Sequence, residues 1–457
     1  MSTLSLRDVH LCFEGAVPAV IATASAAGVP NVTFLSRVRI VDDERVALSN
    51  QFFSKTQRNL AENPRASVLV VDPLSYLEFR LTLVYERTER RGVTFDKLKD
   101  DVEAVAAVSN MQNVFKLRAA DIYRVVDIEP TNSEPRASAI APREPRVTSP
   151  APIGELAARL SRCPDLDAIV GNAVDGLAEL LGYDHSLLLL LDESGTRLFT
   201  IASHGYPVQG VGSEVAIGEG LIGIAAERAM PVRVGNMRQV VRYGASVRRA
   251  YEETGAIEPG REIPVPGLED AESRIAVPML ALGQLIGMVV VESHHKVAFD
   301  ESDEAQLVVL ASIIGNAIEA DRAREATDPA DAQRSPGPRV EADPANRSTH
   351  VRFFAVDGST FLGGDYLIKG VPGRILWSLL GHYDRERRTD FTNKEVRLDP
   401  SLELPEFRDN LDSRLILLKR RLDEREAPIR IEKTGRGTFR LIVEGSVRLD
   451  AVAAPAG

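Results

Sequence analysis

The sequence predicts a multidomain α+β protein built from three modules. Its 457 residues exceed what one hydrophobic core normally organises. Two proline-rich stretches divide the chain, because proline at high density blocks both helices and sheet ladders. Short strand patterns fill the first module, whereas the other two combine helix and strand patterns. The predicted modules are 1–130, 153–323 and 349–450, and the predicted linkers are 131–152 and 324–348.

The composition is that of an ordinary globular protein, with 44% hydrophobic and 26% charged residues. The 55 basic and 66 acidic residues give a net charge of −11, which argues against a protein that coats nucleic acid along its whole length. Residues 349–448 differ from the rest, because their 19 basic and 16 acidic residues give +3. The remainder of the chain therefore carries −14, from −11 − 3.

Cysteine usage and hydropathy bear on the cellular compartment. The two cysteines, Cys12 and Cys163, lie far apart and form no CxxC pair, so we expect neither a disulfide framework nor a zinc ribbon. No apolar run reaches the roughly 20 residues of a membrane span, and the first residues lack a signal-peptide pattern. We therefore expect a cytoplasmic protein without a membrane partner.

The first module reads as a series of short strands separated by turns. The strand patterns cover residues 19–24, 32–41, 45–49, 65–72 and 79–88. Strands at this spacing predict an antiparallel barrel.

One segment of this module has the composition of a phosphate site. Ser54, Lys55, Thr56 and Arg58 lie where a strand pattern gives way to a helix pattern. Hydroxyls donate hydrogen bonds, cations neutralise charge and a helix N-terminus adds a favourable dipole. An ordinary capped surface helix with basic residues would carry the same pattern, and these residues alone leave both interpretations open.

The hairpin 17–49, the Ser54-Lys55-Thr56 run and the Leu-Ala-Glu-Asn-Pro sequence at 60–64 resemble the pyridoxamine-phosphate-oxidase-like, FMN-binding split barrels. The resemblance covers about 8–130, and residues 115–125 are similar to the closing strand of that family. It implies FMN bound at a homodimer interface. The implied cofactor-binding residues are Arg37, Arg39, Ser49, Gln51, Ser54, Lys55, Thr56 and Arg58.

The sequence departs from the oxidases in two places. They carry an Arg-Lys pair after the serine, where this chain has Lys55-Thr56, and their C-terminal basic substrate motif has no counterpart here. We therefore expect the fold without pyridoxamine oxidation. FMN is the expected cofactor, and a deazaflavin, haem or an empty pocket remain open.

The second module alternates helix and strand patterns. A helical pattern at 165–181 precedes buried strands at 185–192 and 198–203, a hairpin at 274–293 and a closing helix at 302–323. The Gly218-Glu219-Gly220-Leu221-Ile222-Gly223 motif and residues 273–289 resemble a GAF domain, over most of 155–322. GAF domains bind diverse small molecules or dimerise, so the ligand is unknown.

Three features of this module have two interpretations each. The long stretch 236–272 predicts either a lid over an anionic ligand or, with more support, a surface insertion. His294-His295 favours capping over metal binding. Leu307, Leu310, Ile314 and Ala317 form either a coiled-coil seam or a face that covers the module's own sheet.

The third module predicts three helices followed by a β-hairpin, after a small sheet. The helix patterns cover 374–383, a capping box that starts at Thr392, and 406–424, and the hairpin covers 429–443. This order is that of a winged helix. Over about 349–446 the segment is similar to the DNA-binding effector domains of two-component response regulators.

The resemblance implies that the third helix reads the major groove while the wing contacts phosphates. Asn410, Arg414, Arg421 and Arg425 share one helical face, and Lys433 and Arg436 lie on the wing. These six are the predicted DNA-binding residues. A solvated basic helix used for protein contact is the alternative.

We therefore expect a homodimeric one-component transcription regulator, in which a cofactor or small molecule in the first two modules controls binding to double-stranded DNA. The runner-up is an FMN- or deazaflavin-dependent oxidoreductase with regulatory GAF and winged-helix modules. The sequence offers no clear catalytic acid or base, since His10 is the only histidine of the first module, and no metal site is expected. An interaction scaffold with an empty barrel is a third interpretation.

Overall fold

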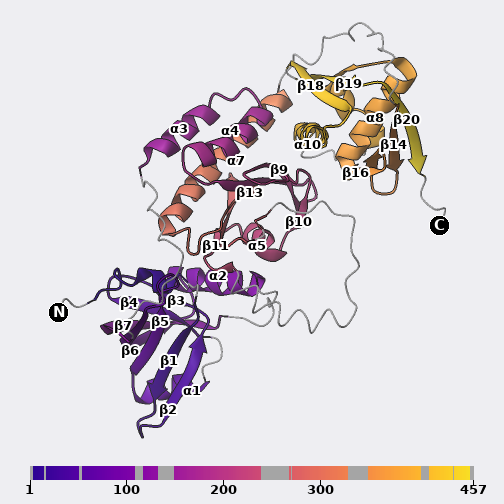
Figure 1. Cartoon of the computed structure of the whole chain (residues 1–457). Helices are drawn as coiled ribbons and strands as arrows, with labels where there is room; N and C mark the ends of the chain where they lie inside the picture. The colour runs from indigo at the N-terminus through magenta and orange to yellow at the C-terminus, as the bar shows by residue number, and fades with distance from the viewer. Residues whose placement is uncertain are drawn as a thin grey trace.

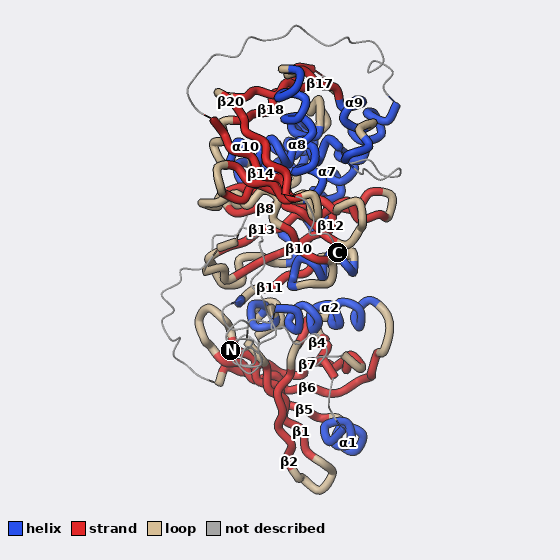
Figure 2. The backbone as a smooth tube through the Cα atoms, turned by 90° about the vertical axis from the view of Figure 1, so that its right-hand side faces the viewer, coloured by secondary structure: helices blue, strands red, loops and turns tan. Residues whose placement is uncertain are grey.

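The computed structural model describes residues 4–14, 17–50, 54–108, 117–131, 149–237, 267–268, 270–327, 348–402, 411–435 and 437–452. Three bodies follow one another along the chain, each with its own sheet or pair of sheets (Figures 1 and 2). Among the described residues no helix combines the length and the apolar character that a membrane crossing requires.

The first module is a curled antiparallel sheet with the strand order β2-β1-β5-β6-β7-β4-β3. The single strand expected at 32–41 is two strands, which lie at opposite edges of this sheet because the chain turns between them at residues 36–37. A short 3-10 helix, His10–Phe13, precedes the sheet. The strands are β1 (Ala19–Ala24), β2 (Pro30–Leu35), β3 (Val38–Ile40), β4 (Arg45–Asn50), β5 (Arg65–Val71), β6 (Glu78–Glu89) and β7 (Ala119–Pro130).

Two helices flank this sheet at opposite ends of the module (Figures 1 and 2). Helix α1 (Ser54–Glu62) is the helix expected after the fourth strand. Helix α2 (Val93–Val108) was not expected from the sequence. Its Leu98 packs with Ala47, Ala120 and Ile122 on the outside of β4 and β7. The other side of α2 faces the second module, where it contacts α5 and β11.

The second module is a six-stranded antiparallel sheet with helices on both faces. Residues of β13 alternate between the two faces, since Val289 and Val291 join the core under α3, α4 and α7 while Met288 and Val290 join the core under α5. The sheet has the order β10-β9-β8-β13-β12-β11. Its strands are β8 (His185–Leu191), β9 (Arg197–His204), β10 (Glu214–Ala216), β11 (Val232–Val234), β12 (Ser273–Ala281) and β13 (Gln284–Ser293), and its helices are α3 (Ala151–Leu160), α4 (Leu166–Glu179), α5 (Gly220–Arg228) and α7 (Glu301–Thr327).

The predicted a/d face of the closing helix covers this module's own sheet. Leu307, Leu310 and Ile314 are buried in the core that α7 shares with β12. Of the two interpretations of this face, the described structure shows the second.

The third module holds two small sheets and three α-helices. The capping box at Thr392 is confirmed, with both of its hydrogen bonds to Glu395 present. Strand β20 was not expected, and it pairs in parallel with β14 across almost the whole module. The sheets are β16-β15-β14-β20 and β17-β19-β18. The elements are β14 (Ser348–Phe354), β15 (Ser359–Leu362), β16 (Asp365–Ile368), α8 (Gly370–Glu386), β17 (Asp390–Thr392), α9 (Asn393–Arg397), a 3-10 turn (Pro400–Leu402), α10 (Leu411–Glu424), β18 (Ile429–Gly435), β19 (Thr438–Val443) and β20 (Ser446–Val452).

Candidate functional site

The predicted cofactor residues fall into two groups, of which the first lies on α1. The Thr56 hydroxyl is buried and accepts a hydrogen bond from Asn31 Nδ2 at 3.0 Å. Lys55 Nζ donates to the carbonyl oxygen of Pro30 at 3.5 Å, and both Lys55 and Arg58 are exposed. Helix α1 is thereby fastened to the β1–β2 hairpin with two cations at its surface.

The second group, Arg37, Arg39 and Ser49, lies on β3 and β4 and beside α2. The backbone amide of Arg37 donates to Ser49 Oγ at 3.0 Å. Arg37 Nε and Arg39 Nη1 each donate to Asp101 Oδ2 at 3.1 Å. Burial alone would raise the pKa of Asp101, but the two guanidinium groups hold that pKa below its usual range. The cations expected to bind a phosphate thus bind a carboxylate of the same chain.

Only the α1 group fits a cofactor phosphate in this arrangement. Arg37 and Arg39 are engaged by Asp101, and α1 and α2 lie at opposite ends of the barrel (Figures 1 and 2). Gln51 lies outside the described residues, as does the side chain of Ser54. The sequence gave no warning of Asp101, because α2 was not expected and its Asp100-Asp101 pair read as solvent-exposed charge.

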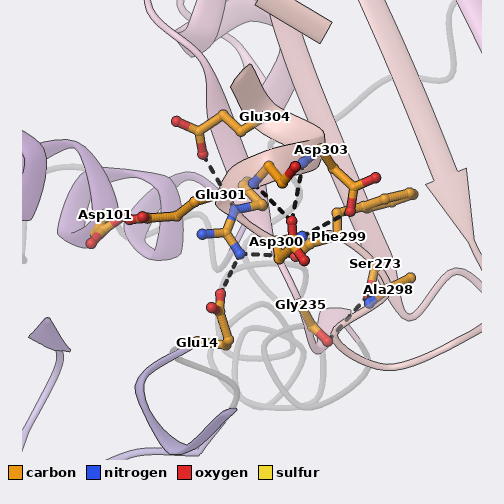
Figure 3. A network of polar contacts seen from close by, with 12 residues as sticks. Glu14, Asp101, Gly235, Ser273, Ala298, Phe299, Asp300, Glu301, Asp303 and Glu304 are labelled. Atoms are coloured by element: carbon orange, nitrogen blue, oxygen red, sulfur yellow. Dashed lines mark hydrogen bonds and ion pairs between the residues drawn. The ribbon is translucent and has the colours of Figure 1, made fainter. Parts of the chain in front are cut away.

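A buried arginine joins the first module to the second (Figure 3). Arg233 on β11 forms an ion pair with Glu14 and donates through Nη1 to the carbonyl oxygen of Phe299 at 2.9 Å. Its Nε lies 3.3 Å from Glu304 Oε2 at the start of α7. Burial alone would lower the pKa of Arg233, but Glu14 and Glu304 hold it above its usual value. The guanidinium is therefore a fixed positive charge at the boundary.

Two more ion pairs cross the same boundary. Arg39 Nη2 lies 2.7 Å from Glu301 Oε1 at the first residue of α7. Arg228 on α5 forms ion pairs with Glu103 and Asp100 on α2, the latter at 3.6 Å. Desolvation raises the pKa of Asp100 to about 6 although Arg228 opposes the shift. A ligand that drew Arg39 away from Asp101 would also disturb the start of α7.

The second module has a polar corner on the sheet face that α5 covers. Glu292 is buried and accepts hydrogen bonds from Arg274 Nε at 2.5 Å, from the Tyr206 hydroxyl at 3.0 Å and from the amide of Leu268 at 2.9 Å. Burial, and then Glu292, raise the pKa of Tyr206. This corner is the most polar part of an otherwise apolar face. The predicted lid lies mostly outside the described residues, which resume at 267.

Histidines border this corner. The His185 ring lies 5.5 Å from the Tyr206 ring and 5.4 Å from the His294 ring. Burial, and then His294, lower the pKa of His185, so its neutral form is favoured near neutral pH. Among the described residues no group of three or more His, Cys, Asp or Glu side chains is arranged to hold a metal ion.

The predicted DNA-binding residues on α10 are all engaged within the chain. Arg421 Nε donates to the carbonyl oxygen of Leu367 at 2.9 Å, and Arg425 Nη2 donates to that of Tyr366 at 3.1 Å. Both therefore brace α10 against β16 of their own module. Arg421 is only 6% exposed.

The other predicted residues of this set face the second module or lie outside the description. Arg414 Nε donates to Glu193 Oε1 at 2.8 Å, and Lys433 Nζ lies 2.8 Å from Asp165 Oδ2. Asn410 and Arg436 lie outside the described residues. Sequence reasoning did not select Lys419 and Arg420, which the structure places at the same boundary, although their position in a basic run was a visible signal.

Two family models match separate parts of this chain. Residues 8–126 match the model described as Pyridoxamine 5'-phosphate oxidase, and residues 163–319 match the GAF domain model. No curated protein shows significant similarity to the chain.

Solved structures resemble single modules. The GAF domain of an Acinetobacter phosphoenolpyruvate-protein phosphotransferase is 22% identical, covering 38% of this chain and 93% of that one with a TM-score of 0.31. An FMN-binding protein of Syntrophomonas wolfei is 17% identical, covering 28% and 90% with a TM-score of 0.23. The free methionine-R-sulfoxide reductase of Neisseria meningitidis is 23% identical, covering 38% and 89% with a TM-score of 0.29.

The family matches agree with the two resemblances read from the residues. The first module has the curled antiparallel sheet of a split barrel, and the second has a six-stranded sheet between helices. The chain therefore contains a PNPOx-like domain at residues 8–126 and a GAF domain at residues 163–319.

Proposed function

We propose that this protein is a ligand-responsive regulator that binds double-stranded DNA through its third module. The supporting observation is the basic surface of α10 and the β18–β19 hairpin, where Arg414, Lys419, Arg420 and Lys433 gather in a chain of net charge −11. The helices α8, α9 and α10 precede that hairpin in the order expected of a winged helix. Cations on a helix and a hairpin are the groups that contact DNA phosphates and base edges.

Sensing is assigned to the other two modules. The PNPOx-like and GAF domains support a ligand-sensing regulatory protein. The phosphate of an FMN is proposed to lie at the start of α1, near Lys55 and Arg58, where a helix N-terminus and two exposed cations coincide. A bound flavin would supply reversible redox chemistry. The GAF ligand is proposed to reach the polar corner around Arg274 and Glu292.

The test is to select duplexes from a random library with the full chain and to measure their affinity by fluorescence anisotropy at two salt concentrations. If about four phosphates are neutralised, affinity should fall roughly 100-fold between 50 and 200 mM salt. Lys433→Ala should weaken binding and flatten the salt slope. Arg80→Ala, a change at an exposed cation of the barrel, is the matched control and should bind as the unaltered chain does. Enrichment of no duplex would refute DNA binding.

The second candidate is a flavin-dependent oxidoreductase, favoured by the PNPOx-like match. The two candidates differ in the absorption spectrum and its consequences. Turnover of a flavin band with a reduced donor, in a protein that selects no DNA, would favour the enzyme. A flavin band whose reduction changes only DNA affinity would favour the regulator.

A further inference from the structure

The outward side of α10 is covered by the GAF domain. Arg420 forms a two-nitrogen contact with Asp167 Oδ1 on α4, at 2.7 Å from Nη2 and 3.0 Å from Nε. Its Nη1 also donates to the carbonyl oxygen of Ile201 on β9 at 3.4 Å. Lys419 Nζ lies 2.8 Å from the second oxygen of Asp167. One carboxylate of the GAF domain therefore holds two adjacent cations of the helix.

Two further pairs extend this boundary in both directions. Arg414 binds Glu193 in the β8–β9 turn, and its guanidinium stacks over the Phe199 ring at 4.4 Å. At the hairpin, Lys433 binds Asp165, the residue that caps α4. Arginine that binds a carboxylate and stacks on an aromatic ring uses the same guanidinium geometry that suits phosphate and bases.

Apolar packing closes the space between these ion pairs. Leu417 is 3% exposed and belongs to a single hydrophobic cluster that contains residues of α4 and β9 as well as α8 and α10. One helical turn further on, at position 424, Glu424 accepts a hydrogen bond from the amide of Gly210 at 3.0 Å. Residues 417, 420 and 424 share one side of the helix, because they are three and four positions apart. This side cannot enter a major groove while the GAF domain covers it.

We propose that the GAF domain holds the third module in an autoinhibited arrangement, with Asp165, Asp167 and Glu193 in the places that DNA phosphates would take. The inference rests on the proposed DNA binding and adds how it is regulated. The same cations cannot pair with the GAF carboxylates and with DNA at once, so the two states exclude each other. A ligand that binds better to the undocked GAF domain would shift the population towards DNA binding.

The experiment compares the full chain with the full-length double variant Asp167→Lys and Glu193→Lys. The new lysines face Lys419, Arg420 and Arg414 and should repel them. Glu179→Lys, a like charge change near the far end of α4 where Glu179 pairs with the exposed Arg159, is the matched control. A milder double variant, Asp167→Asn with Glu193→Gln, serves if the charge reversal impairs folding of the GAF domain.

Two measurements are made on each variant. Hydrogen exchange of the α10 amides reports undocking without DNA, and anisotropy with the selected duplexes reports affinity. The expected result is faster exchange in α10 and at least tenfold tighter DNA binding by the released variant, about 1.4 kcal/mol. The control variant should match the unaltered chain in both measurements.

The other outcomes separate the inference from the function it rests on. Equal DNA affinity of the unaltered and released chains would overturn the autoinhibition and leave DNA binding intact. Unchanged exchange in α10 would show that these carboxylates do not hold the helix, and would overturn it too. Faster exchange with no DNA binding by any variant would overturn the proposed function and this inference with it.

Discussion

At the scale of single residues, the glycines of the Gly218–Gly223 motif have distinct structural roles. Gly218 and Gly220 have φ angles of +82° and +59°, in the left-handed region that favours glycine, and together they turn the chain from β10 into α5. Gly223 is needed for space instead, because a Cβ atom there would lie 2.2 Å from the carbonyl oxygen of Ala216. The motif is thus explained by packing and requires no bound ligand.

Replacing Gly223 by alanine should destabilise the GAF domain by about 1–3 kcal/mol, because the added methyl meets backbone that cannot move aside. Urea unfolding followed by fluorescence would measure the loss. Gly154→Ala is the matched control, since a Cβ atom at that helical position meets nothing within 4 Å and alanine favours helix. A neutral result at Gly223 would show that β10 can shift relative to α5.

At the scale of elements, the contact between α2 and α5 is sensitive to pH. The pKa of Asp100 is raised from 3.8 to about 6, first by desolvation. The folded state then binds the Asp100 proton more tightly than the unfolded state does. Stability from this group is therefore present at acid pH and is lost as pH rises from about 4 to about 6.

Asp100→Asn should remove that loss, and so should stabilise the protein at pH 8 while leaving it unchanged at pH 4. The gain is on the order of 1 kcal/mol once solvent screening of this half-buried group is allowed for. Chemical denaturation at the two pH values measures it. Asp96→Asn, at an exposed acid of the same helix, should show no such difference. Destabilisation at pH 8 would mean that the contact with Arg228 outweighs desolvation.

At the scale of the whole molecule, the edge strand β2 presents an apolar surface. Val32 and Phe34 are 65% and 75% exposed and point to the same side of the sheet. In the described structure β2 has β1 as its strand neighbour and is otherwise an edge. Native proteins usually cover such an edge, and the homodimer expected from the split-barrel resemblance would do so.

Phe34→Lys should therefore convert a homodimer into a monomer, because it places a charge in the middle of the proposed contact. Size-exclusion chromatography with light scattering would give both masses. Val356→Lys, at a similarly exposed valine in the third module, should leave the dimer unchanged. A dimer that survives Phe34→Lys would place the subunit contact elsewhere, and a monomeric unaltered chain would contradict the homodimer.

The sequence by itself determined the features that depend on neighbouring residues. The capping box at Thr392, the strands that alternate in burial and the glycine motif of the GAF domain all follow from spacings of a few residues. The family matches agree with the two resemblances those motifs carried. Helix α2 escaped notice because both of its sides pack, on β4 and β7 and on the second module, so no single apolar stripe stands out.

Only the tertiary structure decided which partner each charged side chain meets. An arginine has the same sequence signature whether it binds a phosphate or a carboxylate, so Arg37 and Arg39 could not be assigned to Asp101 from the chain alone. The same holds for Arg414 with Glu193, and for the parallel pairing of β14 with β20. These contacts join residues that are far apart in the chain, and local propensity carries no information about such contacts.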